Sequence, residues 1–266
     1  MKENRIRKML AEGRCTTATR YWCPWPFFIE AAGAAGNFDY VEVCAEYAAL
    51  SQEDLENIAR AAEIYEMGTM LKVDFANRIY VAQKAVASGF QGINFADHRT
   101  PEQVEETVQA LRAMTDKGGS YGYLNRRFIS TPLGTDQKGH IERLENIVCC
   151  FMIEKTEAFD NLEAICQIPG VDMVQFGPSD WSMNHGWNKA EHKQECREAE
   201  EYMIRTALKY GVQPRCEIST PEEAEYYIGL GVRHFNMGDQ LKLLTSFLKD
   251  QGSVLRKRAD ELDRER

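Results

Sequence analysis

The sequence lacks an excess of basic residues. Its 266 residues include 32 Lys and Arg against 41 Asp and Glu, which gives a net charge of -9 and an isoelectric point near 5.2. Nucleic-acid binding needs a basic surface to meet the phosphates, so this balance argues against nucleic acid as a partner. An acidic cytoplasmic enzyme is the simpler interpretation.

Long apolar runs are also missing. No run approaches the roughly 20 residues that a membrane-spanning helix needs. The opening segment MKENRIRKMLAEG carries charges without the apolar core of a signal peptide. We therefore expect a cytoplasmic protein with no membrane partner.

The cysteines form no paired motif. All eight lie scattered in apolar or strand-like segments, with neither a CxxC pair nor the spacing of a zinc site. Free cysteine is commonly buried as a small hydrophobic residue. We expect these cysteines to be reduced and to lie in the core.

Short β-like segments alternate with helical ones along the whole chain. Eight are apparent: TTATRY, YVEVC, MLKVD, GINFA, IVCCFMIE, MVQFG, VQPRCEI and RHFNMG. This alternation predicts a parallel sheet covered by helices, and eight repeats favour a closed (β/α)8 barrel over an open doubly wound sheet. No GxGxxG motif follows the first segment, which argues against a dinucleotide-binding fold. We expect one barrel domain across residues 1–266.

Helix-start signals follow three of the strand segments, as SQED, TPEQ and TPEE. In the last two, Thr100 or Thr220 can cap the helix and Gln103 or Glu223 can close a capping box. The polar, glycine-rich segment 115–139 interrupts the alternation, and a loop of that length is usually functional or mobile. The charged tail is predicted to be a helix, either solvated or in contact with a partner subunit.

Acidic residues follow several strand segments. In a barrel of this kind, the C-terminal ends of the strands line the active-site face. Glu46, Asp74, Glu154 and Asp180 hold such positions. Glu154 and Asp180 could share a hard divalent cation, which prefers oxygen ligands and keeps waters for a substrate to displace. Each acid could instead cap the helix that follows, and spacing alone leaves both interpretations open.

Residues 153–186, IEKTEAFDNLEAICQIPGVDMVQFGPSDWSMNHG, resemble a specific family pattern. It is that of the HpcH/HpaI class II (metal-dependent) pyruvate aldolases, of the phosphoenolpyruvate/pyruvate barrel superfamily: I-E-T, A-x-x-N-L, G-V-D, then I-G-P-x-D-L-S. Weaker similarity covers EAAGAAGNFDYVEVCAEY and GVRHFNMGDQLKLL. The resemblance implies a (β/α)8 barrel that forms a homo-oligomer, a trimer or hexamer, through its C-terminal helix.

The resemblance also implies a function. Mg²⁺ or Mn²⁺, or another divalent metal, would be held by Glu154 and Asp180. Backbone N–H groups near the turn of Gly177, Pro178 and Ser179 would hold the carboxylate of a 2-oxo acid, with Ser179 itself close by. The implied activity is that of an aldolase-like carbon–carbon lyase working through a metal-bound enolate.

The chain departs from the family pattern in its proton-transfer residues. Where the pattern has Asp-x-Glu-His after the second strand, this chain has Cys-Ala-Glu-Tyr, so that Tyr47 stands in place of the histidine. Lys72 replaces the usual arginine after the third strand. A phenol with a reference pKa near 10 is a poor base at neutral pH. We therefore expect proton transfer to involve Lys72 with Asp97 and His98 after the fourth strand, where an imidazole titrates near neutrality. Tyr47 packing under a loop, and a helix-capping turn at His98, remain the alternatives.

Arginines offer a way to bind a second substrate carboxylate. Arg20 ends the first strand, and Arg126 and Arg127 lie in the long loop, where arginines are otherwise simply solvated. Two other functions stay open. One is decarboxylation, hydrolysis or isomerisation at the same metal site, and the other is a non-catalytic barrel that binds a 2-oxo acid. The presence of both rim acids argues against the second.

Overall fold

The computed structural model describes residues 3–123, 127 and 136–265. Eight parallel strands close into a barrel in which each strand pairs with its neighbour in sequence and β8 pairs with β1. The strands are β1 (Thr16–Tyr21), β2 (Tyr40–Cys44), β3 (Gly68–Val73), β4 (Gly92–Phe95), β5 (Val148–Ile153), β6 (Met173–Phe176), β7 (Gln213–Ile218) and β8 (His234–Asp239). The predicted (β/α)8 barrel is confirmed. Both ends of each predicted strand lie within two residues of the ends of the observed strand.

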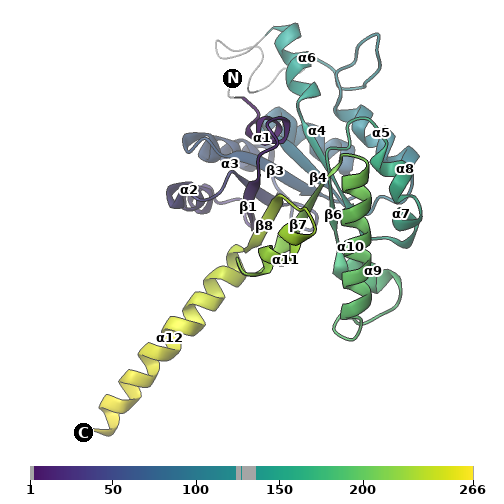
Figure 1. The fold of residues 1–266 in the computed structure, drawn as a ribbon. Helices are drawn as coiled ribbons and strands as arrows, with labels where there is room; N and C mark the ends of the chain where they lie inside the picture. The colour runs from purple at the N-terminus through teal and green to yellow at the C-terminus, as the bar shows by residue number, and fades with distance from the viewer. Residues whose placement is uncertain (1–2, 124–126, 128–135, 266) are drawn as a thin grey trace.

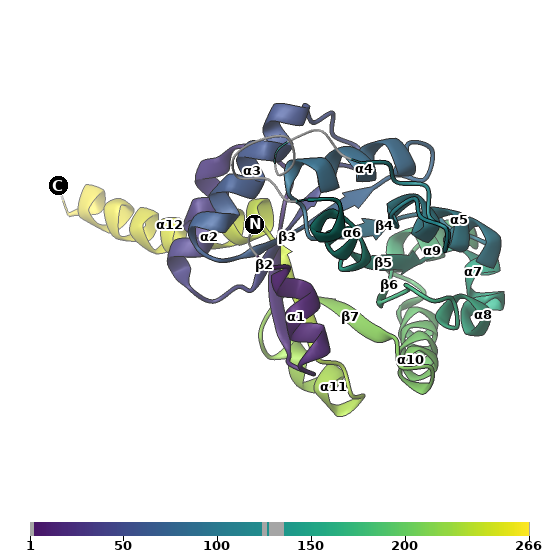
Figure 2. The ribbon, with the colours of Figure 1, turned by 90° about the horizontal axis from the view of Figure 1, so that it is seen from above.

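Helices surround the strands, as the view along the barrel in Figure 2 shows. They are α1 (Arg5–Ala11), α2 (Pro26–Ala35), α3 (Gln52–Ile64), α4 (Arg78–Ser88), α5 (Pro101–Leu111), α6 (Gln137–Glu145), α7 (Thr156–Asp160), α8 (Leu162–Cys166), α9 (Pro178–Asn184), α10 (Lys193–Lys209), α11 (Glu223–Gly229) and α12 (Gln240–Arg264). Among the described residues, no helix combines the length and the apolar character that crossing a membrane requires.

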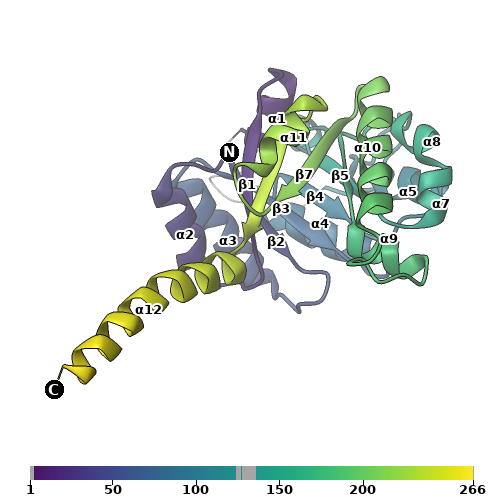
Figure 3. The same cartoon turned by 60° about the horizontal axis from the view of Figure 1, so that its bottom comes forward.

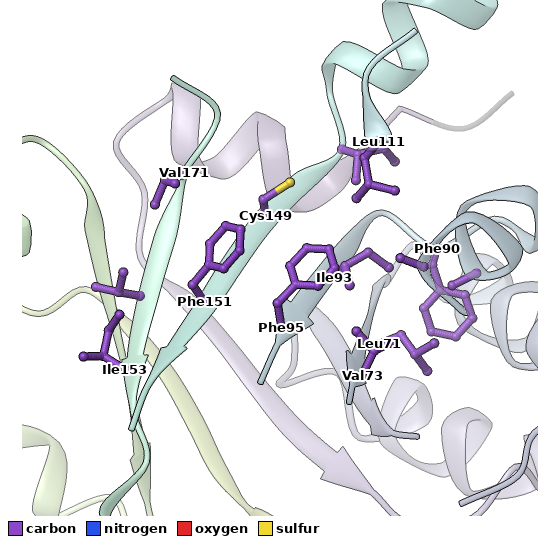
Figure 4. Close-up of a cluster of buried hydrophobic side chains, with 14 of the residues drawn as sticks. Leu71, Val73, Phe90, Ile93, Phe95, Leu111, Cys149, Phe151, Ile153 and Val171 are labelled. Atoms are coloured by element: carbon purple, nitrogen blue, oxygen red, sulfur yellow. The ribbon is translucent and has the colours of Figure 1, made fainter. Parts of the chain in front are cut away.

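The main core fills the space between the strands and the surrounding helices. Figure 4 shows part of it, where Phe95 of β4 stacks on Phe151 of β5 with ring centroids 5.1 Å apart. A second cluster lies inside the barrel, where Ile6 of α1 packs on Tyr40 and Met70. Helix α1 thus covers the N-terminal end of the barrel, and α9 and α12 begin at the opposite end (Figure 1).

Two of the three predicted helix starts are confirmed. Ser51 forms a capping box with Asp54, and Thr100 forms one with Gln103. The third prediction is wrong, because α11 begins only at Glu223. The Glu223 carboxylate accepts the N–H of Ser219 at 2.6 Å, so it is not available to close a box at Thr220.

Most of the cysteines lie in the core, as predicted. Six of the eight are buried, Cys23 is half-buried and Cys15 is exposed, and none of them forms a disulfide among the described residues. The buried thiols belong to the strands and the helices that pack on them, which explains why no spacing pattern links them.

The C-terminal tail forms one long helix, as its sequence predicts. Asp239 caps α12 by accepting the N–H groups of Leu241 and Lys242. The helix then extends away from the barrel (Figures 1 and 3), and none of its residues is buried. Large apolar side chains such as Phe247 and Leu255 are therefore exposed along it.

Candidate active site

The two acids predicted to bind metal lie in one cavity. Glu154 follows β5 and Asp180 lies in the first turn of α9, directly after β6. Because β5 pairs with β6 and both strands run in parallel, the two side chains reach the same end of the barrel. Both line a cavity of about 380 Å³ at the C-terminal ends of the strands.

Glu154 is held firmly in this cavity. Its side chain is almost fully buried, and its Oε1 accepts the backbone N–H of Asp97 at 2.9 Å. Asp97 makes this contact from a left-handed conformation with φ of 62°, which a non-glycine residue adopts rarely and at a cost. Burial, with a smaller contribution from Asp180, raises the pKa of Glu154 to about 7 even though Lys72 acts against it.

Gly177 allows the turn after β6 to lie close to Glu154, which follows β5. A Cβ atom at this position would lie 2.2 Å from Oε2 of Glu154, well inside any real contact. The absence of a side chain at Gly177 therefore lets the Glu154 carboxylate pack directly on the β6–α9 turn.

Lys155, which the sequence analysis did not single out, lies between the carboxylates of Asp97 and Asp180. Nζ of Lys155 is 2.6 Å from Oδ1 of Asp97 and 3.6 Å from Oδ1 of Asp180. The signal was present in the sequence, because this chain reads IEK where the family pattern reads I-E-T. Asp97 thus joins the site through its backbone and through Lys155.

Lys72 and Tyr47 both contact Glu46 at the same end of the barrel. Nζ of Lys72 lies 2.5 Å from Oε2 of Glu46. Burial lowers the pKa of Lys72, but the carboxylates of Glu154 and Glu46 outweigh it and hold that pKa above its ordinary value. Partial desolvation of the Tyr47 hydroxyl, its hydrogen bond with Glu46 and the charge of Asp180 raise the pKa of Tyr47. At neutral pH, Lys72 is therefore charged and Tyr47 is neutral.

Arg20 lines the cavity but is already paired. Its Nε lies 2.5 Å from Oε1 of Glu42 and its Nη1 lies 2.9 Å from Oε2 of Glu217. Glu42 also binds the fully buried Arg215, at 2.7 Å. Although burial acts in the opposite direction, the two guanidinium groups lower the pKa of Glu42 to about 2. Charged residues within the apolar segments YVEVC and QPRCEI were the missed signal for this network.

The expected position of His98 is wrong. Its ring lies among Phe75, Phe95 and Phe151, in the layer between strands and helices, with Nε2 2.8 Å from the Thr107 hydroxyl. Burial lowers the pKa of His98 to about 4. After Asp97 the chain turns the imidazole into the core, where the Ala96 carbonyl and the Thr107 hydroxyl lie within hydrogen-bond distance of its two ring nitrogens.

Of the two arginines of the long loop, the structure places only Arg127, which lies away from the mouth. Arg126 lies outside the described residues. Arg127 pairs with Glu63 at 2.7 Å and donates to the carbonyl of Ser88, at the C-terminal ends of α3 and α4. Those helix ends lie at the barrel end opposite the mouth.

Asp74, another of the four acids that follow strand segments, accepts the N–H of Asn77 at 2.8 Å and so forms a turn.

The turn from Gly177 to Ser179, predicted to bind a substrate carboxylate, has fewer free N–H donors than expected. The N–H of Gly177 already donates to the carbonyl of Ile153, and Pro178 has none. Ser179 and Asp180 lie in the first turn of α9, where backbone N–H groups have no partner within the helix. The Ser179 hydroxyl accepts a hydrogen bond from Nζ of Lys189 at 3.0 Å.

The donor set suits a hard divalent cation. Glu154 and Asp180 offer carboxylate oxygens in a partly open cavity, and Mg²⁺ is commonly bound through one or two carboxylates together with water and substrate. Among the described residues, no group of three or more His, Cys, Asp and Glu side chains converges on one ion position. The pair therefore fits Mg²⁺ or Mn²⁺ better than the closed four-ligand geometry of structural zinc.

The fold and the acids at its open end define the chain as a (β/α)8 barrel with its functional face at the carboxyl ends of the strands. Residues 49–245 match the profile of the HpcH/HpaI aldolase/citrate lyase family. Because this match covers most of the chain, the protein belongs to that family.

Proteins of similar sequence include aldolases at low identity. A hydroxypyruvate/pyruvate aldolase from Cupriavidus necator is 23% identical over 237 residues, which cover 89% of this chain and 86% of the relative. A 5-keto-4-deoxy-D-glucarate aldolase from Klebsiella pneumoniae is 24% identical over 240 residues, which cover 89% of this chain and 91% of the relative. The sequence is thus a divergent member of its family.

Solved structures share the fold. An HpcH/HpaI aldolase/citrate lyase family protein from Burkholderia cenocepacia matches with a TM-score of 0.85 at 17% identity, over 96% of this chain and 100% of that chain. A citrate lyase beta subunit from Mycobacterium tuberculosis, complexed with oxaloacetate and magnesium, matches with a TM-score of 0.57 at 12% identity, over 87% and 94% of the two chains.

Proposed function

We propose that this protein is a divalent-metal-dependent carbon–carbon lyase that acts on a 2-oxo acid. The observation that carries the proposal is the pair Glu154 and Asp180 in one cavity at the open end of the barrel. Membership of a family of aldolases and citrate lyases, and the magnesium and oxaloacetate in a structural neighbour, support it.

Glu154 and Asp180 would hold the cation, Mg²⁺ or Mn²⁺. When bound, it supplies Lewis-acid stabilisation for the enolate charge that develops as the carbon–carbon bond breaks. The N–H groups of Ser179 and Asp180 would orient the substrate carboxylate, as helix N-termini favour anions. Asp97 fixes Glu154 through its backbone N–H, so that the carboxylate needs little reorganisation.

Lys72 supplies positive charge next to this site. Glu46 holds its ammonium at 2.5 Å, and the two carboxylates keep it protonated. Lysine lacks the planar fork of the arginine in the family pattern, so it acts as a point charge on the substrate oxygens. Tyr47, with its raised pKa, donates a hydrogen bond at neutral pH and is not suited to act as a base. We therefore expect Lys72→Met to cost more activity than Tyr47→Phe.

Metal binding and enolate formation test the proposal separately. Calorimetric titration with Mn²⁺ should show binding to the native protein and a loss of at least about 10-fold in affinity in Glu154→Gln and Asp180→Asn, since each removes one charged ligand. Asp74→Asn is the matched control, because it removes a rim acid that caps a turn. Unchanged affinity in both ligand variants would sink the metal assignment.

Enolate formation is read by NMR as exchange of the pyruvate methyl protons for deuterium, and by decarboxylation of oxaloacetate. We expect both reactions in the presence of Mn²⁺ and neither in Glu154→Gln. Binding of pyruvate without exchange or decarboxylation would instead establish a non-catalytic 2-oxo acid-binding barrel.

A further inference from the structure

Three residues considered for proton transfer in the sequence are unsuited to accept a proton at the mouth. His98 lies in the aromatic core, and the raised pKa of Tyr47 keeps its hydroxyl neutral at neutral pH. Burial lowers the pKa of Lys72, but Glu154 and Glu46 outweigh it and keep the ammonium charged. A carbon–carbon lyase still has to move protons, and the group that moves them works best with a pKa near the operating pH.

Glu200 places another carboxyl group in the mouth cavity. It lies in α10, which packs on β6 and β7, and it lines the same cavity as Glu154 and Asp180. The volume of about 380 Å³ is typical of a site for one small molecule, so all three carboxyl groups face the same bound molecule. Oε2 of Glu200 accepts the hydroxyl of Tyr227 at 3.0 Å, so its hydrogen-bond partner is a phenol rather than a lysine or an arginine.

The remaining carboxylate of the cavity is engaged by a cation. Glu217 pairs with Arg20 at 2.9 Å, and Arg20 also binds Glu42. Tyr227 stays neutral, because burial and the charge of Glu200 raise its pKa. Among the described lining residues, Glu200 is therefore the carboxyl group that is neither a candidate metal ligand nor a member of an ion pair.

The surroundings of Glu200 let it change protonation state near neutral pH. Burial raises the pKa of Glu200 to about 7, and the nearby charge of Glu217 adds to the rise. The hydrogen bond from Tyr227 and the charge of Arg197 act against this rise. The other ionisable groups around Glu200 are Lys189, Lys193, Cys216 and Glu223.

We propose that Glu200 carries the proton that moves when the carbon–carbon bond is cleaved. The inference rests on the proposed function for the placement of the 2-oxo acid. In aldol cleavage, the Glu200 carboxylate takes the hydroxyl proton of the substrate as that oxygen becomes a carbonyl and the carbon–carbon bond breaks. The electron pair of the broken bond forms the enolate of the 2-oxo acid. Protonated Glu200 then returns the same proton to the enolate carbon, so that no other acid or base is consumed.

Pyruvate alone tests the reverse of the last step. The Glu200 carboxylate takes a methyl proton, and exchange with heavy water replaces that proton by deuterium, which NMR measures. At saturating Mn²⁺, which keeps Glu154 ionised, the exchange rate of the native protein should rise with pH through about 7 and then level off. Glu200→Gln should lower the rate by about 100-fold or more and abolish the pH dependence, with Mn²⁺ and pyruvate affinities unchanged.

Two further variants separate a proton carrier from a structural residue. Tyr227→Phe removes a hydrogen bond that favours the charged form of Glu200, so the rise in exchange rate should move to higher pH. Glu198→Gln is the matched control, because Glu198 is an exposed acid on the same helix that accepts a hydrogen bond from Gln194. Its exchange rate and pH dependence should equal those of the native protein.

A titration without metal or substrate measures the same group directly. Carbon-13 NMR of the glutamate carboxyl groups should show a resonance that titrates near pH 7 and is missing from Glu200→Gln. A Glu200 resonance that titrates near the ordinary value of about 4.3 overturns the inference.

The inference and the proposed function fail in different ways. Native exchange by Glu200→Gln overturns the inference and leaves the proposed function standing, as does an equal loss of exchange in Glu200→Gln and Glu198→Gln. If the native protein with Mn²⁺ catalyses neither exchange nor decarboxylation, the proposed function is wrong, and the role of Glu200 falls with it.

Discussion

At the scale of single residues, Lys155 changes the charge of the metal site. Its ammonium contacts Asp97 and lies 3.6 Å from Oδ1 of Asp180. It would therefore lie close to any cation that Asp180 binds. Two positive groups at such a separation repel each other strongly in a partly buried site. The family pattern has threonine here, which carries no charge. We infer that Lys155 weakens metal binding in this chain.

Lys155→Met is therefore expected to tighten Mn²⁺ binding by at least about 10-fold, because it removes the repulsion and keeps the apolar stem. Titration calorimetry, or the loss of the free Mn²⁺ signal in electron paramagnetic resonance, measures the change. Lys242→Met is the control, since it removes the same charge from a mouth lysine that pairs with Asp239. Weaker binding in Lys155→Met would show that Lys155 positions Asp180 for the metal.

His98 illustrates how burial changes the role of a residue. Its pKa of about 4 in the folded protein lies below the ordinary value of about 6.5, so the unfolded chain binds more protons between these values. Stability should therefore be highest above pH 6.5 and fall as the pH drops towards 4, by up to about 1.4 kcal/mol per pH unit from this residue.

Urea unfolding at a series of pH values measures this dependence. In His98→Asn, which does not titrate, the free energy of unfolding should fall less steeply over the same pH range. Comparing the two proteins removes the contributions of His234 and Glu154, which also titrate with shifted pKa values. An identical slope in the variant would contradict the assignment of a buried, neutral His98.

At the scale of elements, the site is built by turns that follow neighbouring strands. The turn after β4 gives its Asp97 N–H to Glu154 after β5, and the turn after β6 packs Gly177 on the same carboxylate. Glu154 is thus held between two turns, which fixes one rotamer of its side chain. Neither contact involves a residue close to Glu154 in the sequence.

Gly177→Ala should displace Glu154, because its new Cβ would lie 2.2 Å from Oε2 in the present arrangement. We expect metal affinity to fall by about 10-fold or more while the barrel persists, since only one ligand is misplaced. Gly229→Ala is the control, as a Cβ at that exposed position would meet nothing within 4 Å. Native Mn²⁺ affinity in Gly177→Ala would mean that the turn can retreat without moving the carboxylate.

At the scale of the whole molecule, α12 exposes apolar surface that a single copy of the chain does not cover. Phe247, Leu248 and Leu255 are each more than half exposed on a helix that extends from the barrel. Exposed apolar surface on this scale marks an interaction site. We propose that α12 packs on a second copy of the chain in a homo-oligomer.

Truncation before Asp250 should therefore give a smaller or less stable assembly in light scattering. Leu255→Gln should weaken the assembly in the same direction, because it places a polar group in the expected contact. Lys257→Gln, two residues away on the helix, replaces one polar side chain with another and serves as the control. An unchanged mass for the truncated chain would indicate that the tail is solvated.

The sequence by itself determined the architecture and the placement of Glu154 and Asp180 at the barrel mouth. Alternating strand and helix patterns require a parallel sheet covered by helices, and eight such units of this length close into a barrel. That placement was predictable because both residues follow strand segments closely, and parallel strands bring their carboxyl ends together. Their role as metal ligands was implied by the resemblance to the family pattern. Local signals also located two of the three predicted helix starts, as the boxes at Ser51 and Thr100 show.

Only the tertiary structure decided which way side chains turn beyond the strand ends. Asp97 and His98 are adjacent, yet one faces Lys155 in the mouth and the other lies in the aromatic core. Arg20 looked free in the sequence, but it pairs with Glu42 of the neighbouring strand β2 and with Glu217 of β7, which is distant in the chain. The physical reason is that such pairings depend on register and packing across the barrel, which no local pattern of residues encodes.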